Sequence, residues 1–107
     1  MKADELGKEM LAAAKKSLAK DWGKGEAYAT PELKRLATCL VDIHALKSQG
    51  TVDEQQAKAL LRIHRIATES VLLTIEGLGI IAVENAINAA FAAVKETVNK
   101  AIGFVLL

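Results

Sequence analysis

The segment KSQGTVDEQQ, residues 47–56, lies between two amphipathic stretches and most constrains how this chain can fold. Gly50 can adopt the left-handed backbone conformation in which helices commonly end. Thr51 and Glu54 have the spacing of a capping box, whose side chains satisfy the first free amide groups of a helix. Because a helix stop is followed at once by a helix start, we predict a tight hairpin of two antiparallel helices that turns at Gly50.

Each helix of this hairpin carries an apolar stripe. The first helix is expected to begin with Thr30 as its N-cap and Pro31 in its first turn, and to end near Ser48. Its apolar side comprises Leu33, Leu36, Ala37, Leu40, Ile43 and His44. The apolar side of the second helix comprises Ala57, Leu60, Leu61, His64, Ala67, Val71, Leu72 and Ile75. A charged face lies opposite and is predicted to be solvent-exposed: Lys58, Arg62, Arg65 and Glu69.

The residues before the hairpin predict one further helix and a linker. An apolar residue recurs every four positions, at Leu6, Met10, Ala14 and Leu18. This periodicity predicts a helix over residues 3–21. Gly23 and Gly25 follow in the stretch WGKGEAYA, where two closely spaced glycines are expected to interrupt the helix.

The stretch EGLG, residues 76–79, allows two interpretations of the C-terminal half. Gly77 and Gly79 can form a turn into a last helix over residues 80–102, or they can lie within one long, kinked helix. The apolar stripe passes through both glycines nearly in phase, which favours a continuous helix. We favour the turn, because a single chain cannot cover the apolar sides of a helix of about fifty residues.

The composition agrees with an all-helical chain. Hydrophobic residues make up 51% of the 107 residues and aromatic residues only 4%, so the apolar part is mainly alanine, leucine, isoleucine and valine. Alanine and leucine favour helices, and Pro31 is the only proline. We predict one all-α domain over residues 1–107 that forms a small bundle of four helices, completed by dimerisation. The alternative has three helices, of which the last is long and kinked.

The charge pattern and the single cysteine restrict the function. The formal net charge is +1, with 14 basic and 13 acidic residues interspersed, so no long-range field draws the chain to nucleic acid. Cys39 has no partner for a disulfide within the chain, and a free thiol suits the reducing cytoplasm. The first ten residues alternate in charge and lack the apolar segment of a signal peptide. We therefore expect a cytoplasmic protein that does not bind nucleic acid.

The only two histidines, His44 and His64, lie on the inward stripes of the hairpin. In an antiparallel hairpin that turns near Gly50, they are about seven residues, or roughly 10 Å, apart along the axis. Two ligands of one zinc ion must each lie about 2 Å from the metal, so the pair cannot share an ion within one chain. We expect each imidazole to pack in the core and to bond a side chain, a carbonyl group or a water molecule. The alternative is a metal ion or small ligand held by His44 and His64 across a dimer interface.

The C-terminal half has more apolar surface than a small bundle can bury, which predicts association with a second copy. Ile66, for example, falls off the principal stripe of its helix. Alanines at positions 82, 86 and 90 form a row of small residues that lets another helix approach closely. The predicted homodimer interface comprises Leu73, Ile80, Ala82, Ala86, Ala90 and Phe91.

No catalytic, nucleotide-binding or zinc-binding motif is found, so we expect neither an enzyme nor a cofactor. The sequence predicts a helical module for interaction and oligomerisation, with a second copy or another protein as its partner. A further interpretation is a membrane-associated helical protein that uses residues 71–107, which are weakly polar. Glu76, Glu84, Asn85 and Asn88 make insertion into a bilayer costly, so we do not favour it.

Overall fold

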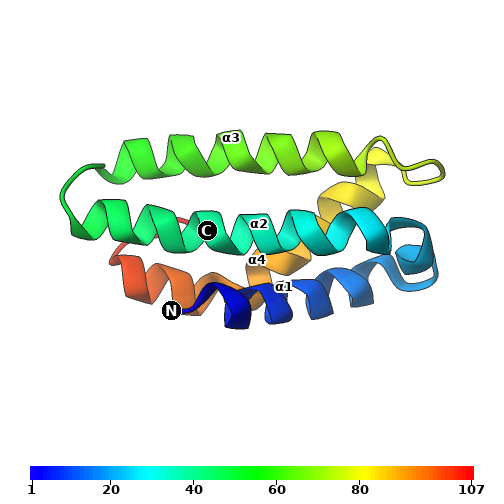
Figure 1. The fold of residues 1–107 in the computed structure, drawn as a ribbon, viewed down its shortest axis with the longest axis horizontal. Coiled ribbons are helices and arrows are strands. Elements are labelled where there is room, and N and C mark those ends of the chain that lie inside the picture. Colours follow the sequence, from blue (N-terminus) through cyan, green and yellow to red (C-terminus); the bar gives the residue numbers. More distant parts are fainter.

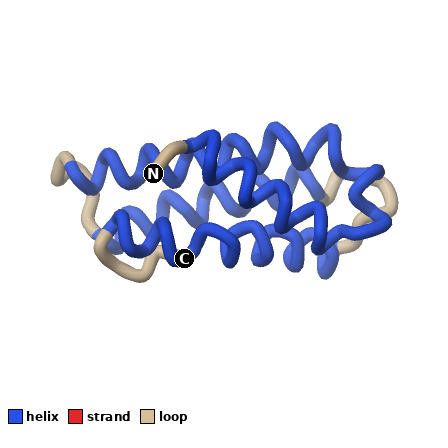
Figure 2. Tube along the Cα trace, turned by 90° about the horizontal axis from the view of Figure 1, so that it is seen from below, coloured by secondary structure: helices blue, strands red, loops and turns tan.

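In the computed structural model, which describes residues 1–107, the chain is helical throughout and contains no strand (Figure 1). The elements in chain order are α1 (Ala3–Leu18), the 3-10 helix η1 (Ala19–Asp21), α2 (Trp22–Ser48), α3 (Glu54–Leu72) and α4 (Ile80–Ile102). They lie along the length of a rod that measures 42 × 22 × 19 Å, with the connecting loops at its two ends (Figure 2). The all-α prediction is confirmed.

α4 packs mainly on α1 rather than on α3, its neighbour in the sequence. It begins beside the end of α3 and crosses behind α2 towards the opposite edge of the rod (Figure 1). α1 packs on both α2 and α4 and so joins them. α3 packs closely only on α2 and contacts α4 little, so it forms an outer edge of the molecule.

A single cluster of 24 buried residues forms the core. Its largest fully buried apolar side chains are Met10, Leu33, Leu36, Leu40, Val83, Ile87, Val94 and Val98, all from α1, α2 and α4. Removing a side chain of this size from water contributes about 1.5–3 kcal/mol, so these three helices supply most of the hydrophobic stabilisation. α3 adds only Ala57, Leu61 and Leu72 to the cluster.

The predicted hairpin between α2 and α3 is confirmed at its turn. Gly50 has a φ of 72°, in the left-handed region. The N–H of Gly50 donates to the carbonyl of Lys47 at 3.0 Å, and the N–H of Thr51 donates to the carbonyl of Leu46 at 2.9 Å. These two hydrogen bonds form a Schellman motif, which satisfies carbonyl groups at the end of α2.

The predicted position of the capping box is wrong by two residues. Asp53, not Thr51, is the N-cap of α3. Asp53 Oδ1 accepts from the N–H of Gln56 at 2.8 Å, and Gln56 Oε1 accepts from the N–H of Asp53 at 2.9 Å. Thr51 belongs to the end of α2, because its amide donates to a carbonyl of that helix. Glu54 pairs instead with Lys58, at 3.0 Å.

The prediction that Gly23 and Gly25 interrupt a helix is also wrong, because α2 runs through both. The chain reverses earlier, at Ala19, which has a φ of 50° and a ψ of −116°. A Cβ atom at Gly25 would lie 3.3 Å from Cδ1 of Leu78 and 3.6 Å from Cδ1 of Ile75. Gly25 therefore allows the connection before α4 to pack closely on α2, and it does not end a helix.

The predicted helix start at Thr30 and Pro31 is wrong for a related reason, since Pro31 lies inside α2. Proline has no amide hydrogen to donate to the carbonyl of Ala27, four residues earlier. Pro31 and Ala27 are both exposed, so water can satisfy that carbonyl group. The solvent-facing side of α2 thus tolerates the proline.

The EGLG stretch lies in a turn, because α3 ends at Leu72 and α4 begins at Ile80. Gly77 has a φ of 89°, which a residue with a side chain rarely adopts. Ile75 and Leu78 of the same connection are only 7% and 9% exposed. The turn is therefore anchored by two buried side chains and is part of the core.

We expect Asp53→Ala to lower the free energy of unfolding by about 1 kcal/mol, because it removes a helix cap. Urea unfolding followed by circular dichroism measures the change. Thr51→Ala is the matched control, and it should stay within about 0.5 kcal/mol of the unsubstituted protein because Thr51 lies outside the capping box. Equal losses in the two variants would contradict the assignment of the cap to Asp53.

Candidate functional site

The two predicted inward-facing histidines differ in their surroundings. Nδ1 of His64, on α3, lies 3.2 Å from Nη1 of Arg35, on α2. A guanidinium group only donates hydrogen bonds, so Nδ1 of His64 accepts and the proton of the neutral ring is on Nε2. His44 is half-buried on α2. His64 thus bonds a side chain across the hairpin.

Arg35 is the centre of a polar cluster between α2 and α3, which we call the hairpin cluster: Glu32, Arg35, His64 and Thr68. The guanidinium of Arg35 donates to Glu32 Oε2 at 2.9 and 3.1 Å and to Thr68 Oγ1 at 2.9 Å. Thr68 Oγ1 donates in turn to Glu32 Oε2 at 3.3 Å. Thr68 is fully buried, and no buried side-chain polar atom in the protein lacks a partner. The cluster is therefore satisfied and fixes the pairing of α2 with α3.

The hairpin cluster has little capacity to hold a metal ion. The guanidinium of Arg35 occupies the lone pair of His64 Nδ1 and places a positive charge beside the ring. No group of three or more histidine, cysteine, aspartate or glutamate side chains in the chain could hold a metal ion. Within one chain, the geometry gives His64 a role in helix packing.

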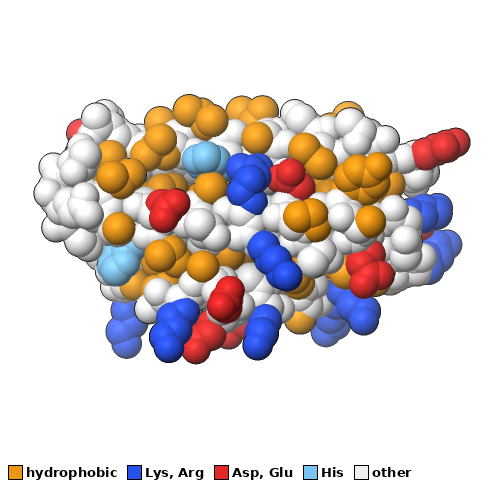
Figure 3. Space-filling model, in the orientation of Figure 1, with side chains coloured by type: hydrophobic (Ala, Val, Ile, Leu, Met, Phe, Trp, Pro, Cys, Tyr) orange, Lys and Arg blue, Asp and Glu red, His pale blue; other side chains and the backbone are white.

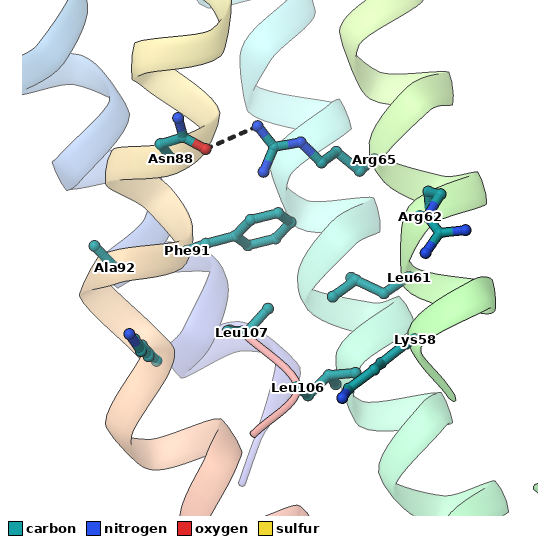
Figure 4. Close-up of a pocket in the computed structure, with 10 residues that line it drawn as sticks. Lys58, Leu61, Arg62, Arg65, Asn88, Phe91, Ala92, Leu106 and Leu107 are labelled. Atoms are coloured by element: carbon teal, nitrogen blue, oxygen red, sulfur yellow. Dashed lines mark hydrogen bonds between the residues drawn. The ribbon is translucent and has the colours of Figure 1, made fainter. Parts of the chain in front are cut away.

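The largest hollow in the surface is a groove between α3 and α4, which we call the α3–α4 groove (Figure 4). It has a volume of about 510 Å³, within the range of small-molecule sites. Its apolar floor is formed by Leu61 from α3, Phe91 from α4 and Leu106 from the C-terminal segment, which is residues 103–107. The groove exists because α4 crosses away from α3, so the side chains of the two helices do not fill the space between them.

The C-terminal segment closes one end of this groove. Asn99 Oδ1 accepts hydrogen bonds from the N–H groups of Leu106 and Leu107, both at 2.9 Å. Its Nδ2 donates to the carbonyl of Leu107 at 3.3 Å. One asparagine on α4 therefore holds the segment in place, and Leu106 is only 8% exposed.

Four cationic side chains and no aspartate or glutamate line the groove: Lys58, Arg62, Arg65 and Lys95. Lys58 pairs with Glu54, but both side chains are about half exposed, so the pair is weak. Arg62 and Lys95 form no ion pair within the chain. The groove is therefore locally positive, although the charge of the whole chain is close to balanced.

Arg65 is the cation that the fold holds most firmly. Its Nε donates to Glu69 Oε1 at 2.8 Å, and its Nη2 donates to Asn88 Oδ1 on α4 at 2.7 Å (Figure 4). Its guanidinium carbon lies 5.6 Å from the centre of the Phe91 ring, within the range of a cation–π contact. Arg65 thus bridges α3 and α4 over the apolar floor.

These contacts correct the predicted orientation of α3. The charged face is predicted to be solvent-exposed, but the side chains of Arg65 and Glu69 are only 30% and 26% exposed. Arg65 reaches across to Asn88 on α4 and pairs with Glu69 on its own helix. The predicted apolar face is only partly buried, since Ala67 is exposed. Thr68 was not expected in the core, and its burial is explained by its two hydrogen bonds in the hairpin cluster.

α3 also presents an apolar stripe to solvent, which we call the α3 outer face. It comprises Ala59, Ile63, Ile66, Ser70 and, directly after the helix, Leu73, all exposed. Ile63 is 63% exposed and Ile66 is 54% exposed, which is unusual for side chains of this size at the centre of a helix. Figure 3 shows apolar side chains along the edge of the molecule that α3 forms.

The residues predicted to form a dimer interface divide into three groups by exposure. Leu73 and Ile80 are 42% and 61% exposed. Ala82 is partly buried against the core. Ala86, Ala90 and Phe91 are buried within the chain, at 2%, 0% and 8% exposure. The row of small residues thus lies on α4, which packs mainly on α1. Of the predicted interface, only Leu73 and Ile80 are open to a partner.

No protein-family model, curated protein or solved structure matches this chain. None of its helices combines the length and the apolar content that crossing a membrane requires. Function is therefore inferred from the two surfaces described above, the α3 outer face and the α3–α4 groove.

We expect Arg35→Met to destabilise the protein more than Thr68→Val. The second change leaves Arg35 and Glu32 bonded to each other, so urea unfolding should show a loss of about 1 kcal/mol. The first leaves the carboxylate of Glu32, 17% exposed, without its counter-charge, and should cost about 2–3 kcal/mol. Adding Glu32→Gln to Arg35→Met should recover part of this loss. The reverse order of the two single variants would contradict the central position of Arg35.

Burial raises the pKa of the Cys39 thiol, and the nearby Arg35 opposes this shift only in part. The folded protein therefore favours the neutral thiol. This preference contributes fully to the free energy of unfolding at pH values below the pKa of the thiol in the unfolded chain. The contribution is lost as the pH rises through the pKa of the thiol in the folded protein. We expect Cys39→Ala to reduce the loss of stability in alkaline solution, as measured by urea unfolding across pH. The native thiol should also react with a disulfide reagent at least about a hundredfold more slowly than the unfolded chain. Equal reaction rates would contradict the burial.

Proposed function

We propose that this protein is a non-enzymatic helical module that self-associates by packing the α3 outer face of one copy against that of a second. The observation that carries the proposal is the exposure of Ile63 and Ile66, at 63% and 54%, in the middle of a helix that has only one close neighbour. Exposed apolar stripes of this kind mark surfaces for protein association. The free Cys39 is compatible with action in the reducing cytoplasm.

The spacing of the α3 outer face is that of a helix-pairing seam. Its members follow one another at alternating intervals of four and three residues: Ala59, Ile63, Ile66, Ser70 and Leu73. This is the repeat with which one helix packs along another in a coiled coil. The core contacts of α3 with α2 lie on the other side, at Leu61 and Thr68, so pairing at the outer face leaves the fold intact.

An antiparallel pair of α3 helices is self-complementary. A twofold axis between Ile63 and Ile66 places each of these side chains against the other in the second copy. The same axis brings Arg62 of each copy within about one turn of Glu69 of the other. Arg62 has no ion pair within its own chain, so the second copy supplies the carboxylate that it lacks. A twofold interface is the commonest solution for identical chains.

The energetic scale is adequate for a dimer. Four half-exposed isoleucine side chains are covered at the centre of the interface, and each contributes about 1 kcal/mol or more. Leu73, which the sequence analysis predicts at an interface, extends the seam. Ile80 lies at the start of α4, beyond the outer face of α3, and is not needed for the pairing. The dimer completes the helical bundle by covering the one helix that has a single close neighbour.

Sedimentation equilibrium tests the proposal with a matched set of variants. The unsubstituted protein is expected to form a dimer, and Ile63→Glu or Ile66→Glu should each produce a monomer, because a charge in the seam is costly to bury. Ile81→Glu is the control, since Ile81 is 74% exposed but lies on α4. Circular dichroism should show that all three variants remain helical. A monomeric unsubstituted protein, or a dimer disrupted equally by Ile81→Glu, would refute the proposed interface.

A further inference from the structure

We infer that the α3–α4 groove binds a small amphipathic anion, in which one carboxylate is joined to an unbranched apolar chain. This site lies beside the α3 outer face, and its argument does not depend on dimerisation. The groove combines a floor of Leu61, Phe91 and Leu106 with a rim of four cations, so it offers two different kinds of contact to one molecule.

The rim is suited to a single anionic group. Lys58, Arg62 and Arg65 project from successive turns of α3, and Lys95 comes from α4 on the other side. No aspartate or glutamate lines the space between them, and Arg62 and Lys95 form no ion pair in the chain. A bound carboxylate would relieve the repulsion among these cations and accept charge-assisted hydrogen bonds from them.

The floor is suited to an apolar chain. Leu61, Phe91 and Leu106 are each about 8% exposed, and what remains exposed of them faces the groove. Arg65 already lies over the Phe91 ring and is held there by Glu69 and Asn88 (Figure 4). This arrangement is largely preformed, so binding requires little reordering of the protein.

The size of the groove favours a free single-chain molecule over a bilayer lipid. Its volume of about 510 Å³ is that of a small-molecule site, and the C-terminal segment, held by Asn99, closes one end. A bilayer lipid carries two chains and lies in a continuous surface, whereas this groove runs between two helices. We therefore assign the groove to a soluble amphiphile.

Isothermal titration calorimetry with sodium decanoate, below the concentration at which it aggregates, tests the inference. One decanoate should bind per chain, and decanol, which has the same chain without the charge, should bind at least about tenfold more weakly. Decyltrimethylammonium, with the opposite charge, should not bind. Absence of saturable decanoate binding, or equal affinity for decanol, would overturn the inference.

A pair of charge reversals on α4 locates the site. Lys95→Glu should weaken decanoate binding about tenfold or more, because it places a carboxylate in the rim. Lys100→Glu makes the same change on an exposed residue of the same helix outside the groove, and should alter affinity less than about twofold. Equal effects would assign binding to general charge and overturn the site.

Two further measurements separate the groove from other sources of binding. Amide chemical shifts of the unsubstituted protein should change on adding decanoate around Phe91 and Ala92, and changes confined to α1 would overturn the assignment. Ile63→Glu should bind decanoate at least as tightly as the unsubstituted protein, and loss of binding in that folded variant would place the ligand elsewhere. Co-sedimentation with vesicles that contain an anionic phospholipid, without binding of free decanoate, would replace the soluble ligand by a membrane surface.

Discussion

The packing of Ile75 and Leu78 on Gly25 places the connection between α3 and α4 against the first turn of α2. Because Gly25 has no side chain, the connection between α3 and α4 can lie directly on the first turns of α2, with Cδ1 of Leu78 at 3.3 Å from the position of an added Cβ. α4 then starts beside the end of α3 and crosses behind α2 to reach α1. Had α4 run back along α3, it would have covered the space that is now the groove. The two surfaces proposed for function both depend on this path of α4, which leaves α3 with one close neighbour.

The hairpin cluster has a different role, which is to fix how α3 is rotated against α2. Apolar contacts between these helices are not directional, whereas hydrogen bonds require specific positions of donor and acceptor. The hydrogen bonds of Arg35 on α2 to His64 and Thr68 on α3 therefore favour the observed rotation. The net stabilisation from a partly exposed ion pair is small, so the value of the cluster lies in specifying one arrangement. That arrangement turns Arg65 towards α4 and Ile63 and Ile66 towards solvent.

The sequence predicts well those features that depend on neighbouring residues. The helical content and the turn at Gly50 follow from local preferences, and so does the presence of a capping box, although its position was wrong by two residues. Gly25 was misread because its contact with Leu78 comes from a distant part of the chain, which a local pattern does not contain. Pro31 was misread because its tolerance within α2 depends on which side of the helix faces solvent. Nothing in the structure explains the glycine at position 23. The cations of the groove were visible as a charged face on α3, but their relation to Phe91 and Lys95 depends on the path of α4. Thr68 gave no signal at all, since a threonine in a helix is usually exposed.

Arg62 lies at the border between the two proposed surfaces, and this has a thermodynamic consequence. In the antiparallel pair, Arg62 approaches Glu69 of the second copy, whereas in the groove it contributes to the cationic rim. Glu69 in turn already accepts from Arg65, the other arginine of the rim. An anion in the groove and a carboxylate from the second copy therefore compete for the same positive charges, so each should weaken the binding of the other. Such coupling is reciprocal. A ligand that fills the groove would therefore weaken dimerisation, and the factor would equal the one by which dimerisation weakens ligand binding.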